Sequence, residues 1–312
     1  MKTYQLAVVI AIGFVVALMA ASSGFGVGPF PTPPPSRAIF EQATLTFVLP
    51  SEEFRPFYLP LLMAEEEEWF SERNLDVEIA YADSERDALD MVVSGKAQFA
   101  FVSAETVIMA RAEGVPVRAV MQVYKNNPLG IAITEDSPLI ESLRGKRIGI
   151  PSDAPQFFVE TLLTQYDLEE EVELAMLDHS IRESDVTKTV DAFKSGKVDA
   201  VMVWATDLPL LRKAGVDAEF LALSSHGLNF PSIALVVSDS FMEEQEEVLL
   251  RTLNPIAKGL KWTVFSPASA AKIMAQSAPY TYGDPEMTEP VARKVGELIM
   301  GGSETKSDIW GV

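Results

Sequence analysis

The sequence predicts an α/β fold built from two similar lobes, and an internal repeat is the main observation behind this prediction. Residues 94–104 (SGKAQFAFVSA) correspond to residues 195–205 (SGKVDAVMVWA) after a shift of 101 positions, and the same shift places residues 45–51 on residues 146–152. Apolar runs that alternate with segments of helical spacing are the second observation, because this alternation is typical of sheets covered by helices. Two such copies predict a cleft between similar lobes, where small molecules usually bind.

The first copy alternates predicted strands and helices in a regular order. A buried strand is predicted at residues 45–49, and the apolar side chains after it recur at helical spacing until Asn74. Ser84 caps a helix that ends at Gly95, because a short polar side chain accepts a first-turn N–H and glycine adopts the left-handed conformation that ends a helix. Ser103 caps the next helix, which ends at Gly114. The remaining strands of this copy are predicted at residues 75–79, 99–102 and 117–123.

The second copy repeats this order, and a third section follows it. In the second copy, strands are predicted around Ile148 and at residues 172–177, 200–203 and 220–223, with helices at residues 156–166 and 184–196 and another that ends at Gly215. The third section contains a predicted strand at residues 233–237 and helices at residues 240–265, 267–277 and 285–300. A kink or break is expected at Pro255, because proline removes a backbone donor from a helix interior. The apolar strands favour parallel sheets with helices on both faces.

These elements predict the domain organisation. By residue 225 the second copy already contains the strands and helices predicted for one lobe. The third section is therefore expected to return to the first lobe. The chain would then cross between the lobes near residues 128–135 and 226–233, and two crossings make a hinge. The predicted boundaries are residues 44–130 together with 231–312 for the first lobe and residues 131–230 for the second.

The N-terminus has the pattern of an export signal. Lys2 precedes an apolar run at residues 6–21, and small residues follow it, as in a secretory signal over residues 1–23. The run is marginal for spanning a bilayer, so an uncleaved anchor is the alternative interpretation. Residues 24–43 form a proline-rich linker that would act as a stiff spacer. An extracytoplasmic location, in a periplasm or at a cell surface, is therefore expected.

Composition excludes several classes of function. The chain has 312 residues with 45 acidic and 25 basic side chains, a formal charge of −20 that repels nucleic acids. It has no cysteine, which excludes disulfides, thiolate metal sites and a cysteine nucleophile. His179 and His226 stand alone, without the spacing of metal ligands. We therefore expect no cofactor, no metal site and no nucleic-acid partner.

The candidate ligand site consists of side chains at the carboxyl ends of the predicted strands, where open α/β sheets bind ligands. The repeat places Glu105 and Trp204 at neighbouring positions of equivalent strand ends. Aromatic residues would supply flat apolar walls, and Glu105 would orient a ligand. For Phe57, Phe157 and Trp204, a purely structural place in the core is the alternative. The candidate ligand-binding residues are Phe54, Phe57, Tyr58, Ser103, Glu105, Tyr124, Ser152, Asp153, Phe157, Trp204 and Asn229.

Four segments resemble a known family. They are residues 69–78 (WFSERNLDVE), 114–117 (GVPV), 137–150 (SPLIESLRGKRIGI) and 196–200 (GKVDA). From Thr44 onward the chain resembles the periplasmic binding proteins for thiamine pyrimidine precursors, riboflavin, taurine and alkanesulfonates, the solute receptors of ABC importers. The resemblance implies a two-lobed periplasmic-binding-protein fold of type II, with two doubly wound α/β domains and a double-crossover hinge. Relatives often continue past the position of Val312, which implies a further helix there.

The resemblance implies a monomeric binding protein that delivers a small solute to ABC permease subunits in the membrane. It extends to pyrimidine synthases, but their cysteine-rich iron-site motif and histidine donor are missing here, so we expect no enzyme. A ligand-sensing domain held by an uncleaved anchor is a further alternative. A sulfonate would favour basic residues at the rim, where few fall apart from Arg55 and Lys125. The family's frequent His-Ala-Pro after the first strand is replaced here by Arg55-Pro56-Phe57. Aromatic walls with a carboxylate favour a flat heterocycle of pyrimidine or flavin type.

Overall fold

The computed structural model describes residues 40–134, 139–152, 154, 156–181, 186–230 and 232–301. The chain divides into two compact units, Met1–Glu41 and Gln42–Val312. The predicted signal or anchor and nearly all of the proline-rich linker lie outside the described residues. Within the described ranges, every helix is too short or too polar to cross a membrane. The fold and the site described below belong to the second unit.

The first sheet contains five strands in the order β2-β1-β3-β10-β4. Strand β1 runs parallel to both β2 and β3, whereas β10 is antiparallel to β3 and β4. The strands are β1 (Ala43–Leu49), β2 (Leu75–Tyr81), β3 (Phe99–Ser103), β4 (Val117–Gln122) and β10 (Ile233–Ser238). The late strand β10 therefore returns to the sheet that the first copy builds.

The second sheet has the same arrangement, in the order β7-β6-β8-β5-β9. Strand β6 runs parallel to β7 and β8, and β5 is antiparallel to β8 and β9. The strands are β5 (Leu129–Ile133), β6 (Arg147–Ile150), β7 (Glu173–Met176), β8 (Ala200–Trp204) and β9 (Glu219–Ala222). We call the first sheet, with the helices that pack on it, the first half of the molecule. The second sheet, with its helices, is the second half. The shift of 101 positions places β3 on β8.

The expectation of parallel sheets was wrong in one respect, because both sheets are mixed. In each sheet the antiparallel strand is the one that the chain forms as it crosses between the halves. The sequence analysis did not predict strand β5, although its apolar run Leu-Gly-Ile-Ala-Ile is typical of a buried strand. These residues lie in the segment 128–135 that was assigned to a crossing between the lobes. The predicted α/β class with two similar lobes is confirmed.

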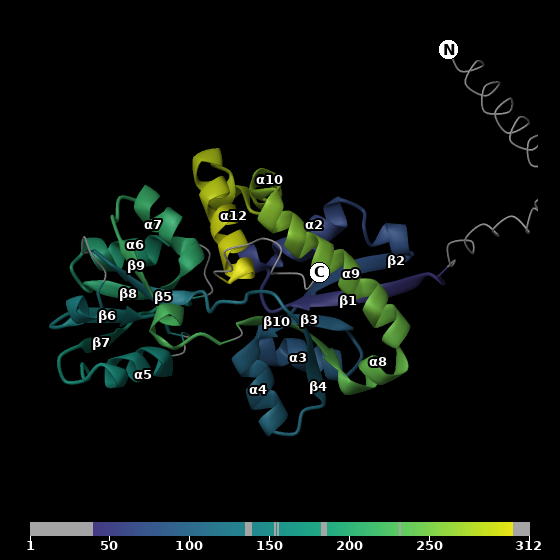
Figure 1. Ribbon diagram of the computed structural model, residues 1–312, viewed down its shortest axis with the longest axis horizontal. Helices are drawn as coiled ribbons and strands as arrows, with labels where there is room; N and C mark the ends of the chain where they lie inside the picture. The colour runs from purple at the N-terminus through teal and green to yellow at the C-terminus, as the bar shows by residue number, and fades with distance from the viewer. Residues whose placement is uncertain are drawn as a thin grey trace, which may run out of the picture. The chain divides into compact units, whose positions relative to one another are not determined.

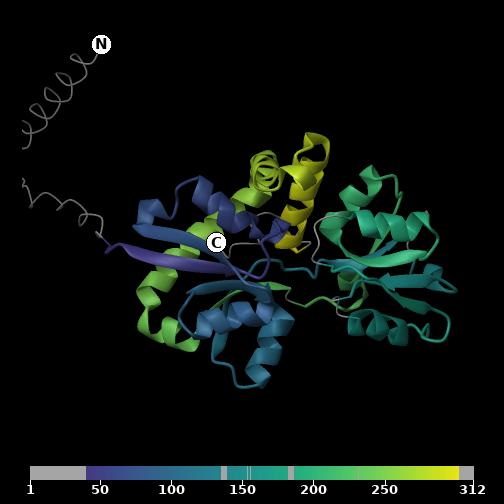
Figure 2. The same ribbon diagram turned by 180° about the vertical axis from the view of Figure 1, so that it is seen from behind.

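Helices cover both faces of the first sheet (Figure 1, Figure 2). Alternate side chains of each strand enter different cores, because successive side chains of a strand point to opposite faces. Phe47, for example, packs in the core under α2, α9, α10 and α12, whereas Val48 packs in the core with α3 and α4. The helices are α2 (Leu59–Glu66), α3 (Glu85–Val93), α4 (Ala104–Ala112), α8 (Asp239–Glu244), α9 (Glu246–Phe265), α10 (Pro267–Ser277), α11 (Pro279–Tyr282) and α12 (Pro285–Met300).

The second sheet is covered by fewer helices. Helix α5 (Phe157–Gln165) packs on one face, and α6 (Thr187–Lys194) and α7 (Leu208–Lys213) cover the other (Figure 1). A short 3-10 helix, η4 (Ala205–Asp207), leads from β8 into α7. Ala205 and Leu210 of this segment join the core of the first half. The two halves are thus in direct apolar contact through η4 and α7.

Helix α9 continues through Pro255, so the predicted break at this residue was wrong. The helix boundary lies ten positions earlier, at Gln245, between α8 and α9. Proline costs one backbone hydrogen bond here, and packing of α9 against α2 and α12 compensates for it. Gly259 allows the closest approach, because its Cα lies against the backbone of Pro60 at the start of α2.

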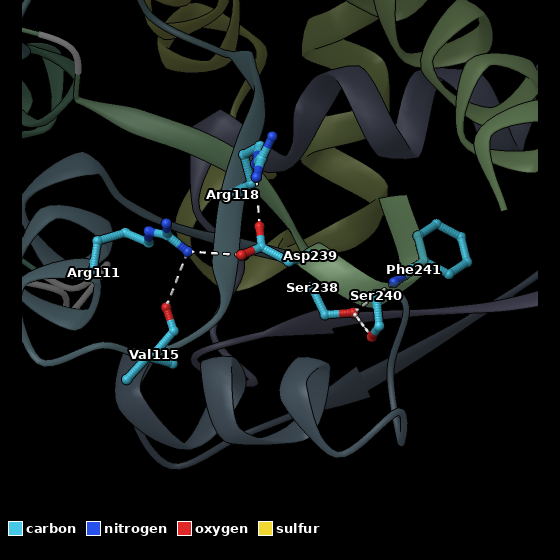
Figure 3. A network of polar contacts seen from close by, with 7 residues as sticks. All are labelled: Arg111, Val115, Arg118, Ser238, Asp239, Ser240 and Phe241. Atoms are coloured by element: carbon cyan, nitrogen blue, oxygen red, sulfur yellow. Dashed lines mark hydrogen bonds and ion pairs between the residues drawn. The ribbon is translucent and has the colours of Figure 1, made fainter. Parts of the chain in front are cut away.

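Asp239 fixes the returning chain to the first half (Figure 3). Its carboxylate accepts hydrogen bonds from Arg111 Nη1 at 2.8 Å and from Arg118 Nε at 3.1 Å, so the end of α4, strand β4 and the start of α8 meet at one side chain. Desolvation acts to raise the pKa of Asp239, but the hydrogen bonds and charges of the two arginines outweigh it, and the pKa is lowered. Ser238 caps α8 by accepting the N–H of Phe241 at 3.1 Å.

The close contact at Gly259 leads to a stability prediction. A Cβ at this position would clash with the carbonyl oxygen of Pro60, which is backbone and cannot rotate away. We therefore expect Gly259→Ala to lower the free energy of unfolding by roughly 1–3 kcal/mol. Gly296→Ala is the matched control, because its Cβ would make only ordinary van der Waals contacts, with Val264 Cα at 3.5 Å and the Thr263 carbonyl oxygen at 3.8 Å. This control should be neutral or up to about 1 kcal/mol stabilising. Urea denaturation measures both, and equal effects would contradict the packing argument.

Candidate functional site

A cavity of about 120 Å³ lies between the two halves. The pairing of the crossing strands places it there. Ser103, the last residue of β3, pairs with Ile233 of β10, and Trp204, the last residue of β8, pairs with Leu129 of β5. All four residues line the cavity. The carboxyl ends of both central strands therefore face the same space, as ligand sites in open α/β sheets require.

Aromatic side chains from both halves form one wall of the cavity. Phe57 follows β1 in a short 3-10 helix and stacks on Trp204, with ring centroids 5.8 Å apart and an angle of 26° between the planes. The guanidinium of Arg55 lies over the Trp204 ring, 5.4 Å from its centroid, and donates a hydrogen bond to the carbonyl oxygen of Ile181 at 3.4 Å. Arg55 and Phe57 belong to the first half, so these contacts join the halves.

Carboxylates and hydroxyls form the opposite, polar edge. Glu85 lies in the first turn of α3 and is only 7% exposed. Its Oε2 accepts hydrogen bonds from Ser103 Oγ at 2.5 Å and from Thr106 Oγ1. Glu105 follows Ser103 in the first turn of α4 and also lines the cavity. Two carboxylates and two hydroxyls thus converge where β3 ends.

Asp207 lies behind the aromatic wall and is 6% exposed. Burial raises the pKa of Asp207 to about 6, although the positive charge of Arg55 and a hydrogen bond from the backbone N–H of Trp204 act to lower it. That hydrogen bond is 3.1 Å long and holds the backbone of Trp204 at the end of β8. Burial also raises the pKa of Tyr124 and of Tyr282, both of which lie close enough to feel the charges of Arg55 and Asp207.

The structure brings part of the predicted site together. The candidate residues that line the cavity are Phe57, Tyr58, Ser103, Glu105 and Trp204. Phe57 both lines the cavity and belongs to the core of the first half. Trp204 packs partly against both cores and still lines the cavity, which makes it a wall between core and cleft.

The other candidates lie elsewhere, and Asp153 is outside the described residues. Phe54 packs edge-on against Tyr282, with centroids 5.5 Å apart, and Tyr124 is fully buried behind Phe57. Ser152 interacts with the backbone carbonyl of His179, with Ser152 Oγ 3.1 Å from the oxygen. Phe157 is 51% exposed on α5, against Phe158.

Asn229 has a structural role between the halves. Its Oδ1 accepts the backbone N–H of Asn127 at 2.9 Å, and its Nδ2 donates to Asn126 Oδ1 at 3.0 Å. Asn126 and Asn127 precede β5 and Asn229 precedes β10, so these bonds tie the two crossing segments to each other. The segments that connect the halves are therefore held as a pair.

Several lining residues were not among the candidates chosen from the sequence. The main ones are Arg55, Glu85, Thr106, Ile181 and Ser232. The sequence placed Arg55 at the rim, where the family frequently has His-Ala-Pro, and it could have been chosen on that ground. Glu85 is the first residue after the cap Ser84, and the start of a helix faces the same sheet edge as the preceding strand end. Ile181 and Ser232 carry no signal in the sequence, because tertiary folding alone brings them to the cavity.

Among the described residues, no group of three or more histidine, aspartate or glutamate side chains is arranged to hold a metal ion. His179 bonds Thr189 Oγ1 through Nε2 at 2.9 Å, and His226 Nδ1 lies 3.0 Å from Tyr166 Oη. Neither histidine lines the cavity.

Comparison with known proteins decides the family. The model of the family described as NMT1/THI5 like matches residues 55–270, more than half of the chain. The chain belongs to the NMT1/THI5-like family. The chain is 27% identical over 254 residues to the riboflavin-binding protein RibY of Chloroflexus aurantiacus, an alignment that covers 79% of this chain and 69% of RibY. It is 26% identical over 224 residues to the formylaminopyrimidine-binding protein of Halalkalibacterium halodurans. This alignment covers 69% of this chain and 64% of that protein.

A solved structure has the same fold as this chain, which confirms the predicted two-lobed periplasmic-binding-protein fold. The periplasmic aliphatic sulphonate binding protein SsuA of Escherichia coli aligns with a TM-score of 0.65 at 14% identity, over 80% of this chain and 83% of SsuA. At this identity the likeness concerns the fold. The alignments with the two binding proteins span about two thirds of those proteins' own lengths. The scaffold segments that suggested the family, such as the turn at Asn74 in the left-handed conformation, lie within the matched residues.

The raised pKa of Asp207 leads to a prediction about pH. Its pKa is about 6 in the folded chain and about 4 in an unfolded chain, so the folded state binds more protons between these values. The stability from this group is therefore complete below pH about 4 and is lost as the pH rises through about 6. Between pH 5 and 7.5, we expect the parent to lose roughly 1 kcal/mol more of its free energy of unfolding than Asp207→Asn.

Urea denaturation at both pH values measures this difference. Asn keeps an acceptor for the Trp204 N–H, so the variant should fold. Asp217→Asn, at an exposed position of the same half, is the matched control and should follow the parent. Parallel pH dependence of the parent and Asp207→Asn would show that Asp207 titrates normally.

Proposed function

We propose that the chain is an extracytoplasmic solute-binding protein of an ABC importer, a monomer that delivers its ligand to permease subunits in the membrane. The observation that carries the proposal is the cavity between the halves, with an aromatic wall contributed by both and a polar edge contributed by the first. Two lobes, at residues 44–130 with 231–312 and at residues 131–230, would close on the ligand by bending at the paired crossing segments. The names of the two binding-protein relatives agree with this function.

A flat heterocycle is the ligand class that the cavity favours. An enclosed volume of about 120 Å³ is below the roughly 300 Å³ where pockets for drug-sized ligands begin. One ring of pyrimidine type therefore suits this conformation better than the three fused rings of a flavin. The carboxylates of Glu85 and Glu105 favour a ligand edge that donates hydrogen bonds. The buried guanidinium of Arg55 is the observation that favours the alternative, a sulfonate.

The stacked pair Phe57 and Trp204 connects binding with movement. Their centroids are 5.8 Å apart, whereas a third ring between them would need about 7 Å, twice the usual contact distance of about 3.5 Å. A ligand ring can stack between these walls only if the halves move apart. Binding should therefore begin from a more open form and end in a closed one.

An enzyme of the pyrimidine-synthase type is the alternative from a different class. The chain has no cysteine, and each histidine is bonded to a hydroxyl away from the cavity. A nucleophile and base in contact are the usual signature of such chemistry. Among the described residues that line the cavity, the polar groups are carboxylates, hydroxyls and a guanidinium, which bind and orient a ligand.

Closure on a ligand tests the proposed function. The ligand can be identified by mass spectrometry of small molecules released from the purified, denatured protein. Small-angle X-ray scattering of the stripped protein with this ligand should then give a smaller radius of gyration, because closure trades cleft surface for ligand contacts. The melting temperature should rise with ligand concentration. An unchanged radius at saturation would contradict closure, and the absence of any released or binding small molecule would contradict the function.

Two substitutions test the roles of the walls. Trp204→Ala should weaken binding of a flat ligand about ten- to a hundredfold, by analogy with the roughly 1–3 kcal/mol that a base gains by stacking on an aromatic side chain. Glu105→Gln should keep the packing and weaken ligands that donate hydrogen bonds to this carboxylate. Isothermal calorimetry measures both affinities, with melting curves as the check on folding. If Trp204→Ala binds as tightly as the parent, Trp204 is only a core residue.

A further inference from the structure

The first turn of α4 borders the cavity through Ser103, Glu105 and Thr106. The N-terminus of a helix normally attracts anions, because its first N–H groups have no partner within the helix. Here protein acceptors take two of these groups. The Ala104 N–H donates to the carbonyl oxygen of Ser232 at 2.5 Å, and the Thr106 N–H donates to Ser103 Oγ at 3.3 Å. Little donor capacity therefore remains for an anionic ligand.

A carboxylate from another helix occupies the same place. Glu85 reaches from the first turn of α3 to the hydroxyls of Ser103 and Thr106, which both donate to its Oε2. These hydroxyls would otherwise be available as donors to a ligand. Because Glu85 is 7% exposed, water screens its charge poorly, and a second anion beside it would be repelled strongly.

A carboxylate also lies near the strand end of the second half. The shift of 101 positions places the hydroxyl residue Thr106 on Asp207, whose carboxylate accepts the Trp204 N–H at 3.1 Å. The positive charge of Arg55 acts on Asp207 and on the face of Trp204. Among the described lining residues, the cation Arg55 is thus opposed by a carboxylate of the protein, and Glu85 and Glu105 add negative charge to the lining.

We propose that Glu85 determines the charge class of the ligand. Its carboxylate fills the place that an anionic group would take at the start of α4, so the cavity admits uncharged or positively charged ligands and rejects sulfonates and other anions. The inference rests on the proposed function and decides between its two ligand classes. In this inference, the charge of Glu85, rather than the shape of the cavity, selects between a heterocycle and a sulfonate.

The test uses ethanesulfonate and inorganic sulfate as probes of anion binding. Glu85→Gln removes the charge but keeps an oxygen that can accept hydrogen bonds from Ser103 and Thr106. By calorimetry at pH 7, the parent should show no saturable binding of ethanesulfonate. Glu85→Gln should show saturable binding, with an affinity at least about tenfold above the weakest that the titration can detect. Glu78→Gln is the matched control, because it changes the net charge equally at an exposed position of β2 and should behave as the parent does.

Two results would overturn the inference. One is tight binding of ethanesulfonate by the parent, which needs no variant and decides the matter even if Glu85→Gln is unstable. The other is a Glu85→Gln variant that melts like the parent and gains no affinity for either probe. Titration of the parent with 4-amino-5-hydroxymethyl-2-methylpyrimidine and riboflavin distinguishes failure of the inference about Glu85 from failure of the proposed function. Binding of either compound, or of the ligand released from the purified protein, leaves the proposed function intact, whereas a parent that binds no small molecule removes it.

Discussion

The pairing of each crossing strand with a central strand is the constraint on which the site depends. Strand β10 lies beside β3 and β5 lies beside β8, each in antiparallel register. One further hydrogen bond extends each ladder past the strand end. Ala104 N–H donates to the carbonyl oxygen of Ser232, and Ala205 N–H, its equivalent after the shift of 101 positions, donates to that of Pro128 at 2.8 Å. The cavity rim in each half is therefore built on backbone bonds that side-chain changes leave in place.

This arrangement suits the hinge closure that we propose. Each half is held by two cores, one on each face of its sheet. Between the halves, the described contacts are fewer. They include the apolar contact of η4 and α7 with the core of the first half, the paired segments at Asn127 and Asn229, the ring stack of Phe57 on Trp204, and the ion pair of Lys213 with Asp284. Contacts of this size can break and re-form at low cost, as domain closure requires.

The electrostatics of the cavity follow from carboxylates that the fold itself places there. Asp207 is tolerated in a buried position because the Trp204 N–H and the charge of Arg55 partly compensate for lost hydration, and the rest of the cost is seen as a raised pKa. Glu85 is tolerated because two hydroxyls donate to it. Each compensation also uses up donors that a ligand would need. Under the proposed role of Glu85, the same hydrogen bonds that stabilise the buried carboxylates also limit which ligands can bind.

The sequence by itself determined the two-copy α/β fold and the positions of the central strand ends, because hydrophobic periodicity and a repeat are local properties of a chain. It therefore placed Ser103, Glu105 and Trp204 at the cavity. It did not distinguish Phe57, which lines the cavity, from Phe54, which packs against Tyr282, because both lie in one loop and only packing decides which ring faces the space.

Tertiary structure alone decided the antiparallel direction of β5 and β10 and the place of Glu85, which meets Ser103 across 18 positions of sequence. Contacts of this kind depend on how separate elements are oriented in space, and no spacing rule along the chain encodes that orientation.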